Sequence, residues 1–112
     1  MTETKISQEE QSQIAKTIVA QLGGFGKLQA MVGAYNIIYL SEGGLKFNFK
    51  GSSRANTCII KLDFATDTYD VEFWKISKSA RVEPKMVADD SMIYFDQLIS
   101  NFEEVTGLCL TL

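Results

Sequence analysis

The sequence has no histidine, one proline and two cysteines in 112 residues. Without histidine, the chain cannot form a Ser-His-Asp or Cys-His catalytic arrangement, so only carboxylate, lysine or tyrosine chemistry is left for a reaction. Cys58 and Cys109 are too few for a structural zinc site, which needs about four Cys or His ligands. We therefore expect a non-enzymatic protein with no metal, no cofactor and no disulfide.

Long hydrophobic runs are also missing, because no stretch of about 18 apolar residues occurs and no transmembrane helix is predicted. The segment from Met1 to Lys5 lacks the apolar stretch of a signal peptide. Hydrophobic residues make up 46% and charged residues 22%, as in soluble globular proteins. We expect one domain over residues 1–112, in the cytoplasm, with no membrane partner.

The charges are unevenly distributed, although the net charge of −3 gives no overall attraction for nucleic acid. From Asp89 onward every charged residue is acidic. Between Glu42 and Asp63 every charged residue is basic, namely Lys46, Lys50, Arg54 and Lys61. We expect one end of the domain to be basic and the other acidic.

The N-terminal part, residues 7–33, is predicted to be helical, after residues 1–6 that we expect to be flexible. Ser7-Gln8-Glu9-Glu10 has the pattern of a capping box, and an apolar stripe with helical spacing follows it. Gly23-Gly24 then predicts a break between two helical segments.

Residues 36–76 alternate between apolar and polar positions and predict four antiparallel strands joined by short turns. Their expected ranges are 36–41, 45–50, 57–64 and 68–76. Residues 77–90, which contain Pro84, are expected to be a loop. A second helix is predicted over 91–107, capped by Asp90 or Ser91, before a tail over 108–112. The predicted fold class is α+β, with an N-terminal helix, a four-stranded antiparallel meander and a C-terminal helix packed on one sheet face.

The stretch Gly23 to Lys27, "GGFGK", resembles a phosphate-binding loop at first sight. Such a loop follows a strand and places Ser or Thr after its lysine, whereas here a helix precedes it and Leu28 follows Lys27. We interpret the stretch as a bend between helical segments that inserts Phe25 into the core.

The acidic pairs and clusters have similarly plain interpretations. Asp63, Asp67 and Asp70 surround one turn but lack the alternating ligands and glycine of a calcium loop, so we expect a solvated acidic tip. Asp89-Asp90 is interpreted as favourable charge at the N-terminus of the second helix.

The expected turns also define a strand register. If the hairpins centre on Gly43-Gly44 and Thr66-Asp67, and Lys50 pairs with Thr57, one face of the sheet carries a core row and the other carries an exposed patch. The core row is Leu40, Phe47, Ile60 and Phe73. The apolar residues on the other face are Ile37, Tyr39, Ile59, Trp74 and Ile76, and Lys61 lies opposite Glu72.

An apolar and aromatic patch left in water usually marks a contact surface. We therefore predict a partner-binding surface formed by Tyr39, Ile59, Trp74, Ile76, Lys46 and Lys50. Two readings without a foreign partner stay open: the tail, the 77–90 loop or a helix covers this face, or a second copy of the chain does. A single-stranded nucleic acid is a less favoured occupant, which would be held by Lys46, Lys50, Arg54, Lys61 and Trp74.

Four segments carry a family resemblance: "QLGGFGKLQAMVGAYNIIY", "LKFNFKGSSRANTCIIKLD", "DTYDVEFWKI" and "VTGLCLTL". Over roughly residues 18–112, the sequence resembles a family of small uncharacterised proteins encoded by tailed bacteriophages and prophages. The resemblance brings no catalytic motif. It implies a non-secreted protein that acts in an infected bacterial cell by binding a host or phage protein, including a defence complex, or a nucleic acid.

Overall fold

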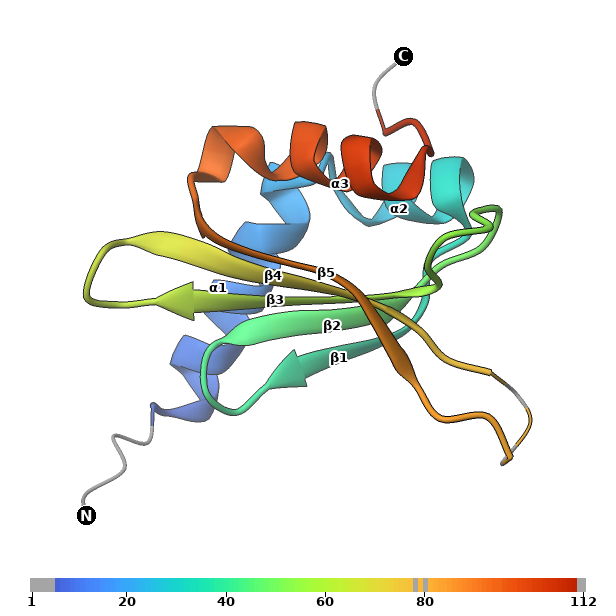
Figure 1. Ribbon diagram of the computed structural model, residues 1–112. Coiled ribbons are helices and arrows are strands. Elements are labelled where there is room, and N and C mark those ends of the chain that lie inside the picture. Colours follow the sequence, from blue (N-terminus) through green and yellow to red (C-terminus); the bar gives the residue numbers. More distant parts are fainter. Residues whose placement is uncertain (1–5, 78, 80, 111–112) are drawn as a thin grey trace.

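The computed structural model describes residues 6–77, 79 and 81–110 and shows three helices packed with a five-stranded sheet (Figure 1). The helices are α1 (Gln8–Gln21), α2 (Phe25–Val32) and α3 (Leu98–Thr106), with a short 3-10 helix, η1 (Phe95–Gln97), before α3. The strands are β1 (Tyr35–Leu40), β2 (Gly44–Asn48), β3 (Thr57–Asp63), β4 (Thr68–Lys75) and β5 (Lys85–Ile93). The predicted flexibility of residues 1–6 concerns, apart from Ile6, residues outside those described.

Local signals define the first two helices as expected. The Ser7 hydroxyl accepts a hydrogen bond from the Glu10 amide at 3.2 Å and caps α1. Gly23 and Gly24 adopt φ angles of 109° and 97°, which separate α1 from α2 and confirm the predicted break. The prediction that Phe25 enters the core is wrong: Phe25 begins α2 and is 39% exposed, because Leu28 and Val32 face the core instead.

The sheet is antiparallel with strand order β1-β2-β3-β4-β5. The α+β class is thereby confirmed, but the expected four strands are five, because residues 85–93 form β5 on the edge of β4 where a loop and the start of a helix were predicted. An edge strand faces water on one side, so it tolerates polar residues that mask the strand pattern. The second helical region begins only at Phe95, where the Gln97 side chain accepts from the Tyr94 amide at 3.0 Å.

The predicted strand register is wrong at each hairpin. Leu40 pairs with Gly44 rather than Phe47, because Gly44 belongs to β2 and not to the turn. A side chain at Gly44 would clash with the Ile60 carbonyl oxygen, so only glycine allows β3 to approach this closely. Thr57 pairs with Asn48 rather than Lys50. The β3–β4 pairing is likewise shifted by two residues, since the turn begins after Asp63.

The observed partner of Leu40 differs from the predicted one by three residues, and a register shift by an odd number exchanges the two faces of β1. Tyr39 pairs with the core residue Leu45 and lies on the helix side, whereas Leu40 pairs with Gly44 on the opposite side. Asn36 has a φ of 51° within a register shift between Tyr35 and Ile38. This bulge brings Tyr35 and Ile38 to the same face although they are three residues apart.

One core joins the helices to the inner sheet face. The Phe102 ring of α3 lies 5.0 Å from Phe49, 5.9 Å from Phe73 and 6.1 Å from Phe47, measured between ring centroids. α1 adds Ala15, Ile18 and Val19 to the same cluster. In Figure 1, α1 crosses behind the strands, and α2 and α3 lie above them.

The C-terminal tail packs against this core through the fully buried Leu110, while residues 111–112 lie outside the described part of the chain. Cys58 is enclosed in the core and Cys109 lies at the surface, and the two form no disulfide. None of the helices in residues 6–110 that the structure describes is long and apolar enough to cross a membrane.

Candidate binding surface on the outer sheet face

The sheet face turned away from the core, here called the outer face, carries two neighbouring rows that cross all five strands, next to a shorter row formed by Leu40, Gly44, Lys61 and Asp70. One row is Tyr35, Asn48, Thr57, Trp74 and Met86. The other is Ile38, Lys46, Ile59, Glu72 and Asp89. The shortest dimension of the molecule is 23 Å, which suits one sheet and one layer of helices, and no described helix lies in front of the strands in Figure 1.

The apolar members of these rows form what we call the outer patch: Tyr35, Ile38, Ile59, Trp74 and Met86. Tyr35, Ile38 and Met86 are 40%, 48% and 42% exposed, while Ile59 and Trp74 are half-buried. Lys46 and Asn48 of β2 lie between the β1 part of the patch and the β3–β5 part. The patch is therefore amphipathic, with a polar strip between two apolar areas.

Hydrogen bonds hold the centre of the outer patch in place. The Trp74 indole nitrogen donates to a Glu72 carboxylate oxygen at 2.9 Å, which fixes the ring orientation. Beside it, the buried Thr57 hydroxyl lies 3.3 Å from the Asn48 side-chain oxygen and 3.2 Å from that of Asn56. The surface is thus preorganised, and a partner would pay little to order it.

The structure brings together only part of the predicted partner-binding set. Ile59, Trp74 and Lys46 lie on the outer face, and Lys50 joins them with its ammonium 5.2 Å from the centre of the Tyr35 ring. Tyr39 does not belong to this face, because it pairs with the core residue Leu45 on the helix side of the sheet.

Ile76 is 38% exposed but lies past the end of β4, where the Asn56 side chain bonds its backbone at 2.7 and 2.9 Å. Sequence reasoning missed Tyr35, Ile38 and Met86. The only signal for the first two was Asn36, a residue type that tolerates the positive φ of a bulge. Met86 was missed because β5 itself was not predicted.

The residues predicted for nucleic-acid binding do not form one track. Lys46, Lys50 and Trp74 share the outer face. The Arg54 guanidinium instead lies 3.3 Å from the Glu104 carbonyl oxygen at the C-terminus of α3, where a cation complements the helix dipole. Lys61 also lies on the outer face, but in the row beyond Lys46 and away from Trp74, where it pairs with Asp70 rather than with Glu72 and its ammonium is 3.8 Å from Glu42.

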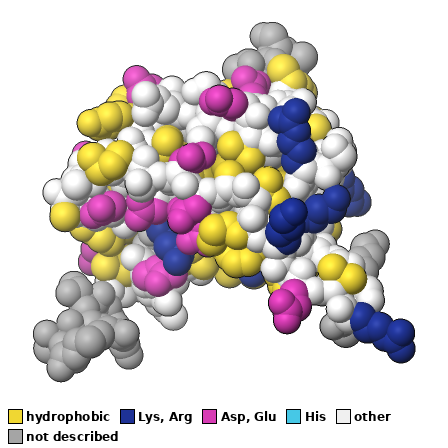
Figure 2. All heavy atoms as spheres, in the orientation of Figure 1, with side chains coloured by type: hydrophobic (Ala, Val, Ile, Leu, Met, Phe, Trp, Pro, Cys, Tyr) yellow, Lys and Arg dark blue, Asp and Glu magenta, His cyan; other side chains and the backbone are white. Residues whose placement is uncertain are grey.

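Figure 2 shows the surface in the same orientation as Figure 1, with hydrophobic side chains near the middle. Lys and Arg gather toward the right of the view, and most Asp and Glu lie toward the left and top. Two of the acidic residues, Asp89 and Asp90, have a place in the fold other than the one predicted. Asp89 and Asp90 lie in β5 rather than at a helix start, and the Asp90 carboxylate accepts from Asn101 at 2.9 Å.

Among the three aspartates predicted to surround one turn, Asp63 stabilises that turn. Its carboxylate accepts a hydrogen bond from the Ala65 amide at 3.0 Å. Within residues 6–77, 79 and 81–110, no group of three or more acidic or cysteine side chains is placed to hold a metal ion. Burial of Cys58 in the core raises the pKa of its thiol, and the scarcity of thiolate makes this side chain a poor nucleophile.

A scan against protein-family models finds no matching family, and searches of curated proteins and of solved structures find no match. The fold and this surface define an α+β domain with an open five-stranded antiparallel sheet.

Proposed function

We propose that the chain is a non-enzymatic binding protein that uses the outer patch to dock on another protein. One observation carries this proposal: three apolar side chains of the patch are 40% or more exposed on a sheet face that no described helix covers. Exposed apolar area that is ordered by hydrogen bonds, as Trp74 is by Glu72, suits a protein contact.

The resemblance to small phage proteins supports a cellular setting for this partner. It favours a host or phage protein in the cytoplasm of an infected bacterium, and inhibition of a host defence complex is one role of this kind. A folded partner with an apolar centre and a mixed-charge rim would match the surface, because Lys46 and Glu72 lie on either side of Ile59 and Glu72 also bonds Trp74.

Capture from infected cells tests the proposal, with Trp74→Ala and Met86→Ser as patch variants and Phe64→Ser as the matched control. Phe64 is 58% exposed but lies in the turn after β3, outside the patch. We expect both patch variants to lose the partner, the control to retain it, and the purified pair to reproduce the contrast. A partner retained by both patch variants, or none recovered, contradicts the proposal.

Binding of single-stranded nucleic acid remains the second candidate, favoured by the Lys50 ammonium over the Tyr35 ring next to Lys46. Glu72 beside Trp74 opposes it, since a carboxylate repels phosphate. Two neutralised phosphates predict a slope of about −1.4 in log affinity against log salt concentration. Titration of Trp74 fluorescence with an oligothymidylate measures this slope. Joint replacement of Lys46 and Lys50 should abolish binding, whereas Lys61→Ala should not, and salt-independent affinity would remove this candidate.

A further inference from the structure

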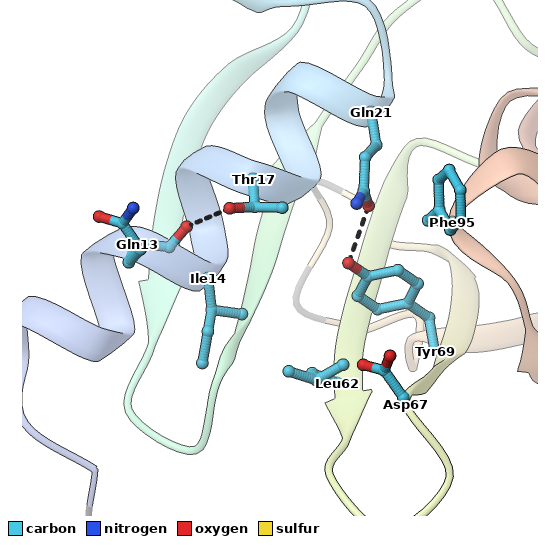
Figure 3. A pocket seen from close by; sticks show the side chains of 8 residues that line it. All are labelled: Gln13, Ile14, Thr17, Gln21, Leu62, Asp67, Tyr69 and Phe95. Carbon is cyan, nitrogen blue, oxygen red and sulfur yellow. Dashed lines mark hydrogen bonds between the residues drawn. The ribbon is translucent and has the colours of Figure 1, made fainter.

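A second binding feature is a pocket of about 240 Å³ on the helix side of the sheet (Figure 3). It lies between α1, the β3–β4 region and η1, whose residues Ile14, Leu62 and Phe95 line it. Its volume is below the roughly 300 to 1,000 Å³ of small-molecule sites and suits one long side chain. Phe95 is 61% exposed, so the pocket is open to a ligand arriving from solvent.

The polar groups of the pocket are the hydroxyls of Thr17 and Tyr69, the side-chain amides of Gln13 and Gln21, and the Asp67 carboxylate. The Tyr69 hydroxyl donates to the Gln21 side-chain oxygen at 2.8 Å, and the Thr17 hydroxyl donates to the Gln13 carbonyl at 2.8 Å. With their protons used in this way, both hydroxyl oxygens keep lone pairs for a further donor. Figure 3 shows the Asp67 carboxylate beside Leu62 and the Tyr69 ring.

The carboxylate of Asp67 forms no ion pair with any residue in the described part of the chain, and no lysine or arginine lines the pocket. Burial raises the pKa of Tyr69, and the negative charge of Asp67 raises it further, while the hydrogen bond to Gln21 opposes the rise. The carboxylate therefore acts electrostatically on the pocket interior.

We propose that this pocket binds a lysine side chain of a partner protein. The methylene stem would lie on Ile14 and Leu62, and the ammonium would meet the Asp67 carboxylate beside the Tyr69 ring. Adjacent aromatic rings of Tyr69 and Phe95 favour a cation as well. A single carboxylate suits the compact ammonium of lysine, whereas the guanidinium of arginine is best held by two parallel hydrogen bonds.

This inference shares with the proposed function the premise that the chain binds a protein, but it uses a different surface. The pocket lies on the α1 side of the sheet and the outer patch on the other. Trp74→Ala should therefore leave the pocket unaffected. Failure of the lysine experiment below would leave the outer patch proposal standing, and the reverse also holds.

The test is an NMR titration of the labelled full chain with acetyl-lysine methylamide. The corresponding norleucine and arginine compounds serve as comparisons. We expect saturable chemical-shift changes at the Gln21 side-chain amide and the Asp67 backbone amide. The Kd should lie between about 1 and 50 mM, because a single side chain supplies the binding free energy. Norleucine, which lacks the ammonium, should bind at least about fivefold more weakly.

Asp67→Asn removes the charge with little cost to the fold, because asparagine tolerates the left-handed φ of 55° found at this position. It should weaken lysine binding by up to about fivefold, the upper end of the effect of one exposed ion pair. Asp70→Asn is the matched control, since it removes an equal charge from the neighbouring strand outside the pocket. Phe95→Ala should weaken binding severalfold, whereas Phe25→Ala should not.

Three results would overturn the inference. They are equal binding of norleucine and lysine, equal weakening by Asp67→Asn and Asp70→Asn, and arginine binding as tight as lysine or tighter. Absence of shifts below about 50 mM lysine compound would do the same. The thermal unfolding of each variant separates loss of the site from loss of the fold.

Discussion

Replacement of Gly44 by alanine tests the strand register on which the composition of the outer patch depends. A Cβ at this position would clash with the Ile60 carbonyl oxygen and would lie 3.0 Å from the Lys61 Cα and 3.1 Å from the Leu40 Cδ1. Two of these atoms are backbone atoms in the centre of the sheet, so no rotamer change relieves the contact. The β2–β3 pair would have to separate locally.

Overpacking of this kind costs about 1 to 3 kcal/mol, and we expect the upper end because the obstacle is backbone. For a chain of 112 residues, a loss of about 3 kcal/mol lowers Tm by about 12 °C. Urea unfolding at 25 °C, followed by Trp74 fluorescence, gives the free energy directly. Gly26→Ala is the matched control, since a Cβ there meets no atom within 4 Å and α2 should gain about 0.5 to 1 kcal/mol.

The alternative register, in which Gly43-Gly44 is the centre of the turn, predicts a different outcome. Gly44 would then be a turn residue at the surface, and its replacement would cost only backbone strain, about 1 kcal/mol. A loss for Gly44→Ala of about 1 kcal/mol or less would therefore refute the close approach of β2 and β3. It would also return Tyr39 to the outer face.

The remaining predictions concern the core and two ionisable groups. Phe102→Ala should lower the free energy of unfolding by about 3 to 5 kcal/mol, because its ring is 1% exposed, whereas Phe25→Ala should cost less than about 1 kcal/mol; equal losses in urea unfolding would contradict the packing. A thiol reagent should modify Cys109 in the native protein at least tenfold faster than Cys58, as followed by mass spectrometry, and equal rates would show that the core opens readily. Because the pKa of Tyr69 is raised above 10.0 in the folded state, its contribution to stability is intact below pH 10 and is lost as the pH rises through the raised pKa; NMR titration of the ring should show a lower pKa in Asp67→Asn, and an unchanged pKa would refute the electrostatic contact.

The parts of the fold that the sequence allowed us to predict are those that depend on neighbouring residues. The Ser7 cap and the Gly23-Gly24 break use interactions within about four residues, and the structure has both. The first four strands were likewise found to within one or two residues, since alternation is a property of the strand itself.

The register could not be predicted, because it depends on contacts between segments far apart in the chain. The close approach at Gly44 requires the position of Ile60, and the bulge at Asn36 has meaning only against β2. The strand β5 depends on β4 in the same way. Its exposed residues include Lys85 and Asp89, which resemble a loop until the backbone pairing is known.

The candidate surface follows the same division. Trp74 and Ile59 were found from strand periodicity, while Tyr39 was misplaced and Met86 missed for want of the register. The pocket around Tyr69 was not predictable, since α1, the β3–β4 turn and η1 meet there only in the folded chain.

The geometry of the sheet edges bears on how a partner, including a second copy of the chain, would approach. The pairing of β5 with β4 has register shifts at two places, and Met92 has a φ of 59°, while β1 has its bulge at Asn36. Such irregularities interrupt the row of backbone groups that an added strand would need. Contact through the outer face is therefore favoured over extension of the sheet. A dimer formed in this way would cover Trp74 and compete with any other partner of the patch, whereas a dimer formed at an edge would not compete.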